Sequence, residues 1–432
     1  MRKNKVDIIT LGCSKNLVDS EQLMRQFLAN GYTVEHDPHK INGEIVIVNT
    51  CGFIGDAQEE SINMILELGE QKRKGRIGKL IVMGCLSERF RKEMESELPE
   101  VDRFYGKFDW KRLLTDIGKS YYQELVTDRV LTTPRHYAYL KIGEGCNRTC
   151  SYCSIPIITG AYNSRPMEEI VDEVRRLVKH GVKEFQMIAQ DLTYYGLDLY
   201  KRAVLAELVE RVSDVPGVEW IRLHYGYPSH FPYDLLPVMR ERTNVCKYMD
   251  IALQHISDSM LSLMRRNITK AETYELLNRM REEVPGIHIR TTLMVGHPGE
   301  TERDFEELIQ FVKDKRFERL GAFAYSHEEG TYAYKHYEDA IPSEVKQERL
   351  DYLMRVQEGI SLDVNAAKVG QVLKVMVDRE EEDFYVGRTE FDSPDVDPEM
   401  LISKEKELKA GQFYQVEVSD AQAFDLYGKI VI

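Results

Sequence analysis

Three cysteines near the middle of the chain constrain its fold and chemistry more than any other feature. Cys146, Cys150 and Cys153 stand at C-x3-C-x2-C spacing, and thiolates are the ligands that iron–sulfur clusters need. Three thiolates can hold three irons of a four-iron cluster and leave the fourth iron open. A closed zinc site needs a fourth His or Cys ligand, and none follows locally. We therefore expect a cluster, with a zinc knuckle that has a remote fourth ligand as the alternative.

Three cysteines closer to the amino terminus each follow a short apolar run. Cys13, Cys51 and Cys85 come after residues 6–12, 45–50 and 80–84, and helical patterns lie between these runs at 17–29 and 57–72. Such runs are typical of buried parallel strands. The carboxyl ends of parallel strands share one edge of an open sheet, where sites are built. We therefore expect a second cluster site here; the alternative is three buried cysteines that act as small hydrophobes. Cys246, just before an apolar strand, is interpreted as structural.

The length of 432 residues predicts two or three domains rather than one core. We expect an open parallel α/β sheet domain at 1–134, a partial (β/α)6 barrel with a connecting helix at 135–365, and a small antiparallel β-barrel at 366–432. The barrel prediction rests on strand patterns at 137–142, 184–189, 218–223, 248–253, 287–294 and 320–325, with helical patterns between most of them. Cys146 lies just past the first of these strands, where chemistry in such barrels belongs.

A long amphipathic helix and five short strands are expected after the barrel. Pro342 opens the helix, which runs to about Ala367 with a core face of Leu350, Leu353, Met354, Ile360 and Leu362. The strands are expected at 372–378, 383–387, 399–403, 412–418 and 423–432, a pattern that fits a small barrel related in style to oligonucleotide-binding folds.

Charge and hydropathy restrict the partners of the chain. Its net charge is −14, and residues 366–432 hold 8 Lys and Arg against 15 Asp and Glu, which is half of that excess. An acidic module repels RNA, whose phosphates call for basic residues, but it attracts a basic protein; a merely solvated acidic surface is the alternative. No apolar run is long enough to cross a bilayer, and cysteines that carry clusters need a reducing compartment. We expect a cytoplasmic protein without membrane association.

The whole chain resembles the radical S-adenosylmethionine (SAM) methylthiotransferase family, which combines a cysteine-bearing amino-terminal domain, a radical SAM barrel and a TRAM barrel. Within the family it is most similar to the branch that modifies an aspartate of the twelfth small-subunit ribosomal protein. The segments that carry the resemblance are 11–21, 189–196, 248–255, 324–331 and 387–397. Two positions depart from the common pattern, Thr159, where Arg is frequent, and His297, where an aromatic residue is frequent.

The resemblance implies two 4Fe-4S clusters, one on Cys146, Cys150 and Cys153 and an auxiliary one on the three upstream cysteines, with SAM at the open iron of the first. It implies that reductive cleavage of SAM yields a radical that takes the aspartate β-hydrogen, that the auxiliary cluster holds the sulfur, and that a second SAM provides the methyl group. Side-chain acid–base chemistry cannot remove such a hydrogen, so cofactors carry the reaction. Tyr152, Gln190 and Arg290 are candidate SAM contacts.

The implied partners are the basic ribosomal protein, free or in the subunit, and a flavodoxin or ferredoxin-type reductant. The main alternative is the relative that methylthiolates adenosine in tRNA, which shares every cysteine argument; the acidic terminal barrel makes direct tRNA binding the less favoured reading. A non-catalytic iron–sulfur carrier or RNA-binding scaffold is a further alternative. A carrier needs clusters fully ligated by protein, whereas each cysteine triad leaves one iron open.

Overall fold

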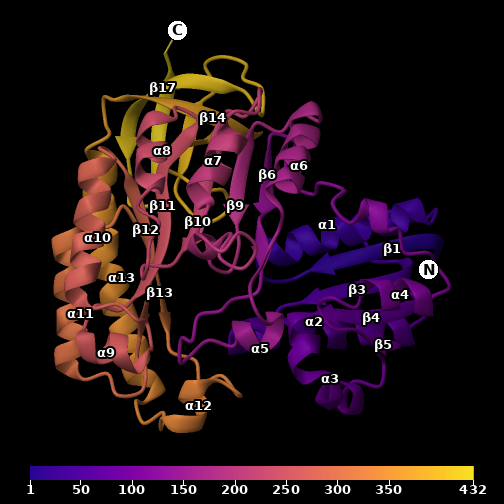
Figure 1. Cartoon of the computed structure of the whole chain (residues 1–432). Coiled ribbons are helices and arrows are strands. Elements are labelled where there is room, and N and C mark those ends of the chain that lie inside the picture. The colour runs from indigo at the N-terminus through magenta and orange to yellow at the C-terminus, as the bar shows by residue number, and fades with distance from the viewer. Residues whose placement is uncertain (432) are drawn as a thin grey trace.

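Five parallel strands form the amino-terminal sheet of the computed structural model, which describes residues 1–431 (Figure 1). The order is β2-β1-β3-β4-β5, so the three strands that precede cysteines are neighbours in the middle of the sheet. The elements of this part are β1 (Arg2–Thr10), α1 (Ser14–Ala29), β2 (Thr33–His36), β3 (Gly43–Thr50), α2 (Gly55–Arg73), β4 (Lys79–Gly84), α3 (Cys85–Glu97), β5 (Arg103–Phe104), α4 (Trp110–Asp116) and the 3-10 turn η1 (Gln123–Leu125). The apolar runs form strands because their side chains are buried on both faces, against α1 and α4 on one side and α2 and α3 on the other.

Six parallel strands in the order β13-β12-β11-β10-β9-β6 form the central partial barrel. The strands are β6 (Tyr137–Lys141), β9 (Glu184–Ile188), β10 (Trp220–Gly226), β11 (Val245–Gln254), β12 (His288–Val295) and β13 (Arg319–Ala324). Their helices are α6 (Met167–Lys179), α7 (Leu205–Ser213), α8 (Leu235–Glu241), α9 (Asp258–Leu263), α10 (Lys270–Glu283) and α11 (Glu302–Lys315), with the turn η2 at Leu192–Tyr194. Figure 1 shows the amino-terminal sheet, in indigo, beside the barrel, with α1 packed against the edge strand β6.

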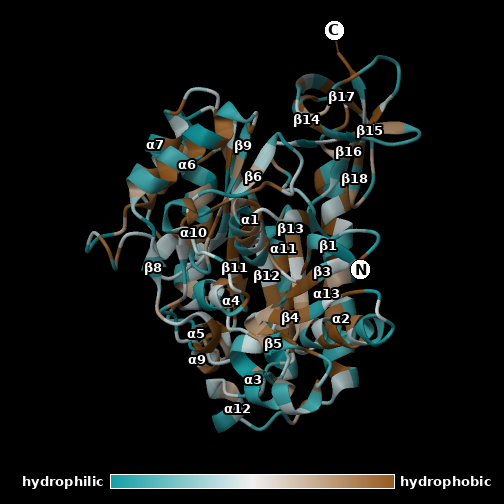
Figure 2. Cartoon of the chain, turned by 90° about the vertical axis from the view of Figure 1, so that its right-hand side faces the viewer, coloured by the Kyte–Doolittle hydropathy of each residue, from teal (hydrophilic) through white to brown (hydrophobic). Residues whose placement is uncertain are grey.

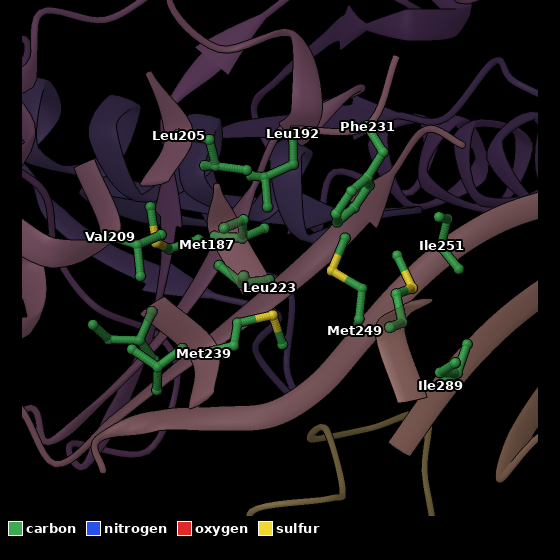
Figure 3. Close-up of a cluster of buried hydrophobic side chains, with 14 of the residues drawn as sticks. Met187, Leu192, Leu205, Val209, Leu223, Phe231, Met239, Met249, Ile251 and Ile289 are labelled. Carbon is green, nitrogen blue, oxygen red and sulfur yellow. The ribbon is translucent and has the colours of Figure 1, made fainter. Parts of the chain in front are cut away.

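The outer face of the barrel strands is apolar and packs under the helices. Figure 3 shows this layer, in which Met187, Leu223 and Met249 from three neighbouring strands meet Leu205 and other residues of the covering helices. Strand side chains alternate between two faces, so the residues in between point into the barrel. Figure 2 shows the same division at the scale of the chain, with hydrophobic residues on the strands and hydrophilic residues on outer helices and loops.

The inner face of the barrel is polar toward the amino ends of its strands. Glu184, Arg222 and Arg388 form a buried ion cluster there, with Arg388 2.8 Å and Arg222 3.1 Å from the Glu184 carboxylate. Arg388 belongs to the carboxyl-terminal barrel, so this cluster joins two parts of the chain. Buried charges of this kind are stable only when they are paired and hydrogen-bonded.

The carboxyl-terminal part is a closed five-stranded barrel in the order β14-β15-β16-β18-β17. Its strands are β14 (Val372–Glu380), β15 (Phe384–Thr389), β16 (Glu399–Ser403), β17 (Phe413–Ala421) and β18 (Asp425–Ile430). The loop between β15 and β16 inserts into the amino end of the central barrel, where Arg319 binds Asp392 at 2.6 Å and Tyr248 donates to Asp397 at 2.7 Å. His288 stacks on Phe391 with ring centroids 4.0 Å apart. This loop therefore closes the base of the partial barrel.

The expected fold class, with its open parallel sheet, partial parallel barrel and small closed β-barrel, is confirmed by this architecture. The connecting helix is α13 (Ser343–Ala366), which begins after Pro342 as expected. Its core face was predicted wrongly at Leu362, which is 44% exposed. Polar residues that bond to neighbouring elements are buried instead, among them Gln357, which donates to the Phe317 carbonyl at 2.9 Å.

Several smaller features complete the description. The strands β2 and β5 and the short pair β7 (Gly143–Glu144) and β8 (Asn163–Ser164) were not predicted, and neither were α5 (Ile155–Thr159) and α12 (Tyr332–His336). The last expected strand, 423–432, corresponds to β18, and Ile432 lies outside the described residues. Across residues 1–431 no helix is both long and apolar enough to span a membrane. The division into domains at 134/135 and 365/366 stays a prediction.

Candidate functional site

The first cysteine triad lies in a loop at the carboxyl end of β6, between β7 and α5. Backbone hydrogen bonds hold this loop in place: the Cys146 amide donates to the Gly160 carbonyl at 3.1 Å and the Ser151 amide to the Met264 carbonyl at 3.0 Å. The three thiols are partly buried and close enough for their charges to interact. The loop therefore gathers Cys146, Cys150 and Cys153 at the end of the barrel where such folds place their chemistry.

Hydrogen-bond donors surround these sulfur atoms. The guanidinium of Arg266, which is only 2% exposed, donates to Cys150 Sγ at 3.2 Å, and the Arg148 amide donates to Cys146 Sγ at 3.4 Å. The Tyr227 hydroxyl lies 3.7 Å from Cys150 Sγ. Donors of this kind stabilise negative charge on sulfur, so they suit the thiolates that form when a metal binds.

Tyr152, the first candidate SAM contact, is half-buried between two of the cysteines. Its hydroxyl accepts a hydrogen bond from Arg266 at 3.2 Å, and its ring meets His297 edge-on with centroids 6.3 Å apart. His297 is buried and lies 3.2 Å from Ser151 Oγ. His297, which stands where an aromatic residue is frequent in the family, therefore packs beneath the cysteine loop.

The second cysteine triad lies at the carboxyl ends of β1, β3 and β4. A Cβ added to Gly12, whose φ is +89°, would stand 2.8 Å from Cys51 Sγ, so the turn before Cys13 brings the backbone against Cys51. Cys85 donates to the Asn16 side-chain oxygen at 3.5 Å, and its charge interacts with those of Cys13 and Cys51. The structure places the three cysteines together at the edge of the sheet that faces the barrel.

A buried polar network runs from the second triad toward the barrel. Lys107, 2% exposed, donates to the same Asn16 oxygen at 3.2 Å and to Asp19 at 2.6 Å. Lys141 of β6 binds both Asp19 and, at 2.9 Å, Glu144. Burial raises the pKa of Glu144, but Lys141 and Lys107 lower it more, so this carboxylate stays charged. The network therefore joins the two domains by ion pairs.

Gln190 and Arg290, the other candidate SAM contacts, lie on the inner side of the barrel. Gln190 follows β9; its amide nitrogen donates to Glu144, and its amide oxygen is buried without a hydrogen-bond partner. Arg290 of β12 lies 3.4 Å from both Asp250 and Asp397, so it touches the inserted loop of the terminal barrel. The amide oxygen of Gln190 is closed off from solvent, so it does not by itself mark a ligand position.

Lys15 bridges the gap between the two domains just beside Cys13. Its ammonium lies 3.5 Å from the centre of the Tyr225 ring, at the end of β10. Tyr225 has φ +62° and is 36% exposed although it ends a barrel strand. Burial lowers the pKa of Lys15, but Tyr225, Cys13 and Glu144 raise it more, so its amino group is charged.

Two further contacts join the loops that follow the cysteines. Ser154 donates to the Phe53 carbonyl at 3.1 Å, which ties the residue after Cys153 to the segment after Cys51. Arg89 of α3 donates to the Gly52 carbonyl at 2.6 Å and binds Glu328 of the barrel at 3.0 Å. Both ends of the Arg89–Glu328 pair are buried, so this contact fixes the segment after Cys51 relative to the loop that follows β13.

The donor sets fit clusters better than single ions. Each set consists of cysteines alone, and thiolates are the ligands that iron–sulfur clusters need; within residues 1–431 no three His, Cys, Asp or Glu side chains form a group that could hold a single metal ion. All six cysteines are free of disulfides. Burial raises the pKa of Cys146 to about 11 and that of Cys85 to about 12, so metal binding would release protons.

The sequence pointed to both cysteine triads but missed most of their surroundings. Arg266, Tyr227 and Lys107 reach the cysteine sites from distant parts of the chain, and no local pattern marks them. Cys246 is buried beside Trp220, Tyr248 and Met376, away from both triads, in agreement with a structural role.

Comparison with known families divides the chain into three matched segments. Residues 140–312 match the radical SAM superfamily, residues 5–106 match the uncharacterized protein family UPF0004, and residues 369–431 match the TRAM domain. These segments cover most of the central barrel, whose last strand β13 lies beyond the first segment, most of the amino-terminal sheet, and the terminal barrel.

Curated relatives match over the full length. The ribosomal protein uS12 methylthiotransferase RimO of Parabacteroides distasonis is 85% identical over 100% of both chains, and the protein of the same name from Porphyromonas gingivalis is 70% identical over 100% of both. That of Flavobacterium johnsoniae is 53% identical, covering 99% of this chain and 98% of its own.

Solved structures share the fold at low identity. The radical SAM methyltransferase TsrM from Kitasatospora setae, with cobalamin and a [4Fe-4S] cluster bound, has a TM-score of 0.53 at 15% identity and covers 75% of this chain and 72% of its own. The cobalamin-dependent radical SAM enzyme OxsB has a TM-score of 0.51 at 13% identity and covers 82% of this chain and 56% of its own.

Proposed function

We propose, from the premise that this chain belongs to the RimO family of ribosomal protein uS12 methylthiotransferases, that it replaces a hydrogen on the β-carbon of an aspartate in uS12 with a methylthio group. The chain is a radical SAM enzyme, and the full-length identity of 85% to one such methylthiotransferase is the observation that carries the proposal. It supports the ribosomal substrate over tRNA adenosine, because the identity extends through all three matched segments.

We assign the SAM-binding 4Fe-4S cluster to Cys146, Cys150 and Cys153, and a second, auxiliary cluster to Cys13, Cys51 and Cys85. When bound, two clusters and SAM supply the hydrogen abstraction and the sulfur transfer that no side chain can perform. The chain's own residues provide ligands, charge and shielding. Arg266 and the Arg148 amide direct hydrogen bonds at the first sulfur set. At the second set the side-chain oxygen of Asn16 accepts hydrogen bonds from Cys85 and from Lys107.

Tyr152, Gln190 and Arg290 are retained as proposed SAM contacts. For Gln190 the support is its place directly after β9 on the inner side of the barrel, beside Glu144. Arg290 is paired with two carboxylates, so its proposed role is to orient polar groups at the barrel wall rather than to act as a free cation.

The terminal barrel is the proposed docking surface for basic uS12. Three of its 15 carboxylates form buried ion pairs with arginines of the same chain: Asp378, Asp392 and Asp397. Leaving these out together with the buried Lys368 and Arg388, 12 carboxylates face 6 basic residues in this part. The exposed surface is therefore still acidic, which favours a basic protein and disfavours tRNA.

We also propose a flavodoxin or ferredoxin-type electron donor and a cytoplasmic location, because reduced clusters and seven free cysteines need a reducing compartment. The function is tested with reconstituted, anaerobically reduced protein, SAM and sulfide. A peptide that covers the target-aspartate loop of uS12 and unmodified tRNA are offered separately, and both are analysed by mass spectrometry. A methylthio gain on the peptide alone is expected; a gain on tRNA alone would overturn the substrate assignment.

A further inference from the structure

Lys15 is a buried cation without an ionic partner in the described part of the chain. It is 8% exposed, and no carboxylate of residues 1–431 lies within ion-pair distance of its amino group. Its amino group contacts the Tyr225 side chain, through the ring and through a hydrogen bond, but no anion of the described residues pairs with it. Lysine is almost never buried in this way unless it is paired, so a ligand is the natural partner.

Lys15 lies between the two cysteine triads. It is the second residue after Cys13 and belongs to α1, whereas the ring on which its ammonium rests belongs to Tyr225 of the barrel strand β10. A substrate that is activated at one triad and receives sulfur at the other must occupy this gap. The left-handed backbone of Tyr225, at φ +62°, is a strained conformation for an aromatic residue, and it holds the ring under the ammonium.

The carboxylates near Lys15 are already paired with other cations. The nearby buried network contains the ammonium groups of Lys107 and Lys141 and the carboxylates of Asp19 and Glu144, which neutralise each other in pairs. Lys15 therefore has no carboxylate of its own among the described residues, and the sulfur of its neighbour Cys13 is the proposed ligand of a cluster. A substrate carboxylate fits beside Lys15, and the substrate of the proposed reaction carries one on the reacting side chain, before and after the reaction.

We propose that Lys15 binds the side-chain carboxylate of the target aspartate and so positions its β-carbon between the two cysteine triads. The inference rests on the proposed function. It also makes Lys15 a residue that selects a carboxylate substrate, because the base of adenosine carries no charge that could replace the carboxylate.

The test is a cycle of two proteins and two peptides. Reconstituted wild type and Lys15→Met are titrated by fluorescence anisotropy with the uS12 loop peptide and with the same peptide carrying Asn in place of the target Asp. Wild type should bind the Asp peptide roughly 10- to 100-fold more tightly, as a charged hydrogen bond predicts. Lys15→Met should bind both peptides alike, and Lys15→Arg should keep most of the preference.

Three controls separate this role from others. Lys119→Met removes another lysine that rests on an aromatic ring, that of Tyr32 at the far end of α1, and should keep the preference. Iron and sulfide content should be unchanged in Lys15→Met; a loss of iron would overturn the proposal, because Lys15 would then serve the cluster at Cys13. An undiminished Asp preference in Lys15→Met would overturn it as well.

The proposed function and this inference fail in different ways. Wild type that methylthiolates the peptide while Lys15→Met keeps the Asp preference refutes the role of Lys15 alone. Wild type that ignores the peptide and modifies tRNA refutes the proposed function, and with it the carboxylate that Lys15 is proposed to bind.

Discussion

Single residues around the sulfur atoms decide what each cysteine set can hold. The donors at Cys150 and Cys146 come from Arg266 and from the Arg148 amide. Buried arginine beside a thiol is costly unless negative charge develops there. The neighbourhood of Cys150 suits a thiolate ligand. Cys246 also has a buried arginine near it, Arg222, but it stands apart from the other cysteines, beside Trp220, Tyr248 and Met376.

Substituting one cysteine in each triad tests the assignment of two clusters. Cys150→Ser and Cys85→Ser should each reduce the iron bound after reconstitution to about half that of the wild type, because each removes one ligand of only one cluster. Both should abolish methylthiolation. Iron and acid-labile sulfide analyses measure the effect, with Cys246→Ser as the control that keeps full iron. Full iron in Cys85→Ser would contradict an auxiliary cluster at the strand ends.

Among the elements, the strands that carry the cysteines could be predicted because their β-branched runs end in turn residues, and parallel strands bring such ends together. The inserted loop between β15 and β16 could not. Its partners, such as Arg319 for Asp392 and Tyr248 for Asp397, lie far away in sequence, and a polar residue on a barrel strand gives no sign of what covers it. The prediction that Leu362 belongs to the core face failed for the same reason, because α13 buries polar residues that bond to other elements.

The ion cluster at the base of the barrel should contribute strongly to stability. Glu184→Gln leaves Arg222 and Arg388 buried without their shared countercharge, and breaking a buried pair costs about 3–5 kcal/mol. Urea unfolding of both proteins measures the loss. Glu399→Gln, which removes the partner of the exposed Arg379, should cost less than about 1 kcal/mol. Equal effects of the two substitutions would contradict a structural role for the inserted terminal barrel.

The contact between the terminal barrel and the central barrel should stabilise the protein less at low pH. Burial raises the pKa of Asp378, but Arg388 and His136 lower it more, to about 2. A lowered carboxyl pKa adds stability above the unfolded-state value, near 4, that is lost as pH falls toward 2. Asp378→Asn lacks this contribution, so wild-type apoprotein should exceed the variant by about 2 kcal/mol at pH 5 in urea unfolding. The difference should vanish near pH 2, and a constant difference would contradict the account.

In the whole molecule, the amino-terminal sheet lies beside the barrel, and the segments that follow the two cysteine sets touch one another. Much of this juxtaposition rests on few contacts, among them Arg89 with Glu328, Ser154 with Phe53, and the network around Lys107. The sequence indicated two sites but not their relation, because each contact joins residues that are distant along the chain and unremarkable locally.

Removing one of these contacts should lower methylthio transfer without lowering SAM cleavage. Arg89→Met removes the bonds to Gly52 and Glu328 without touching a cysteine. SAM cleavage, measured as 5′-deoxyadenosine by chromatography, should persist, while methylthio transfer to the peptide falls about tenfold or more. The exposed Arg73→Met, whose pair with Glu100 is 3.8 Å long, should change neither. Equal loss of both activities in Arg89→Met would contradict a role in domain alignment.

The most direct measurement of the central claim is tandem mass spectrometry of uS12 itself. The chain is co-expressed with uS12 from its own source in a host that lacks any uS12 methylthiotransferase, alongside the Cys150→Ser variant. The account predicts a methylthio group in place of one hydrogen on a single uS12 aspartate with the wild type, and none with the variant. Unmodified uS12 together with newly methylthiolated tRNA adenosine would contradict it.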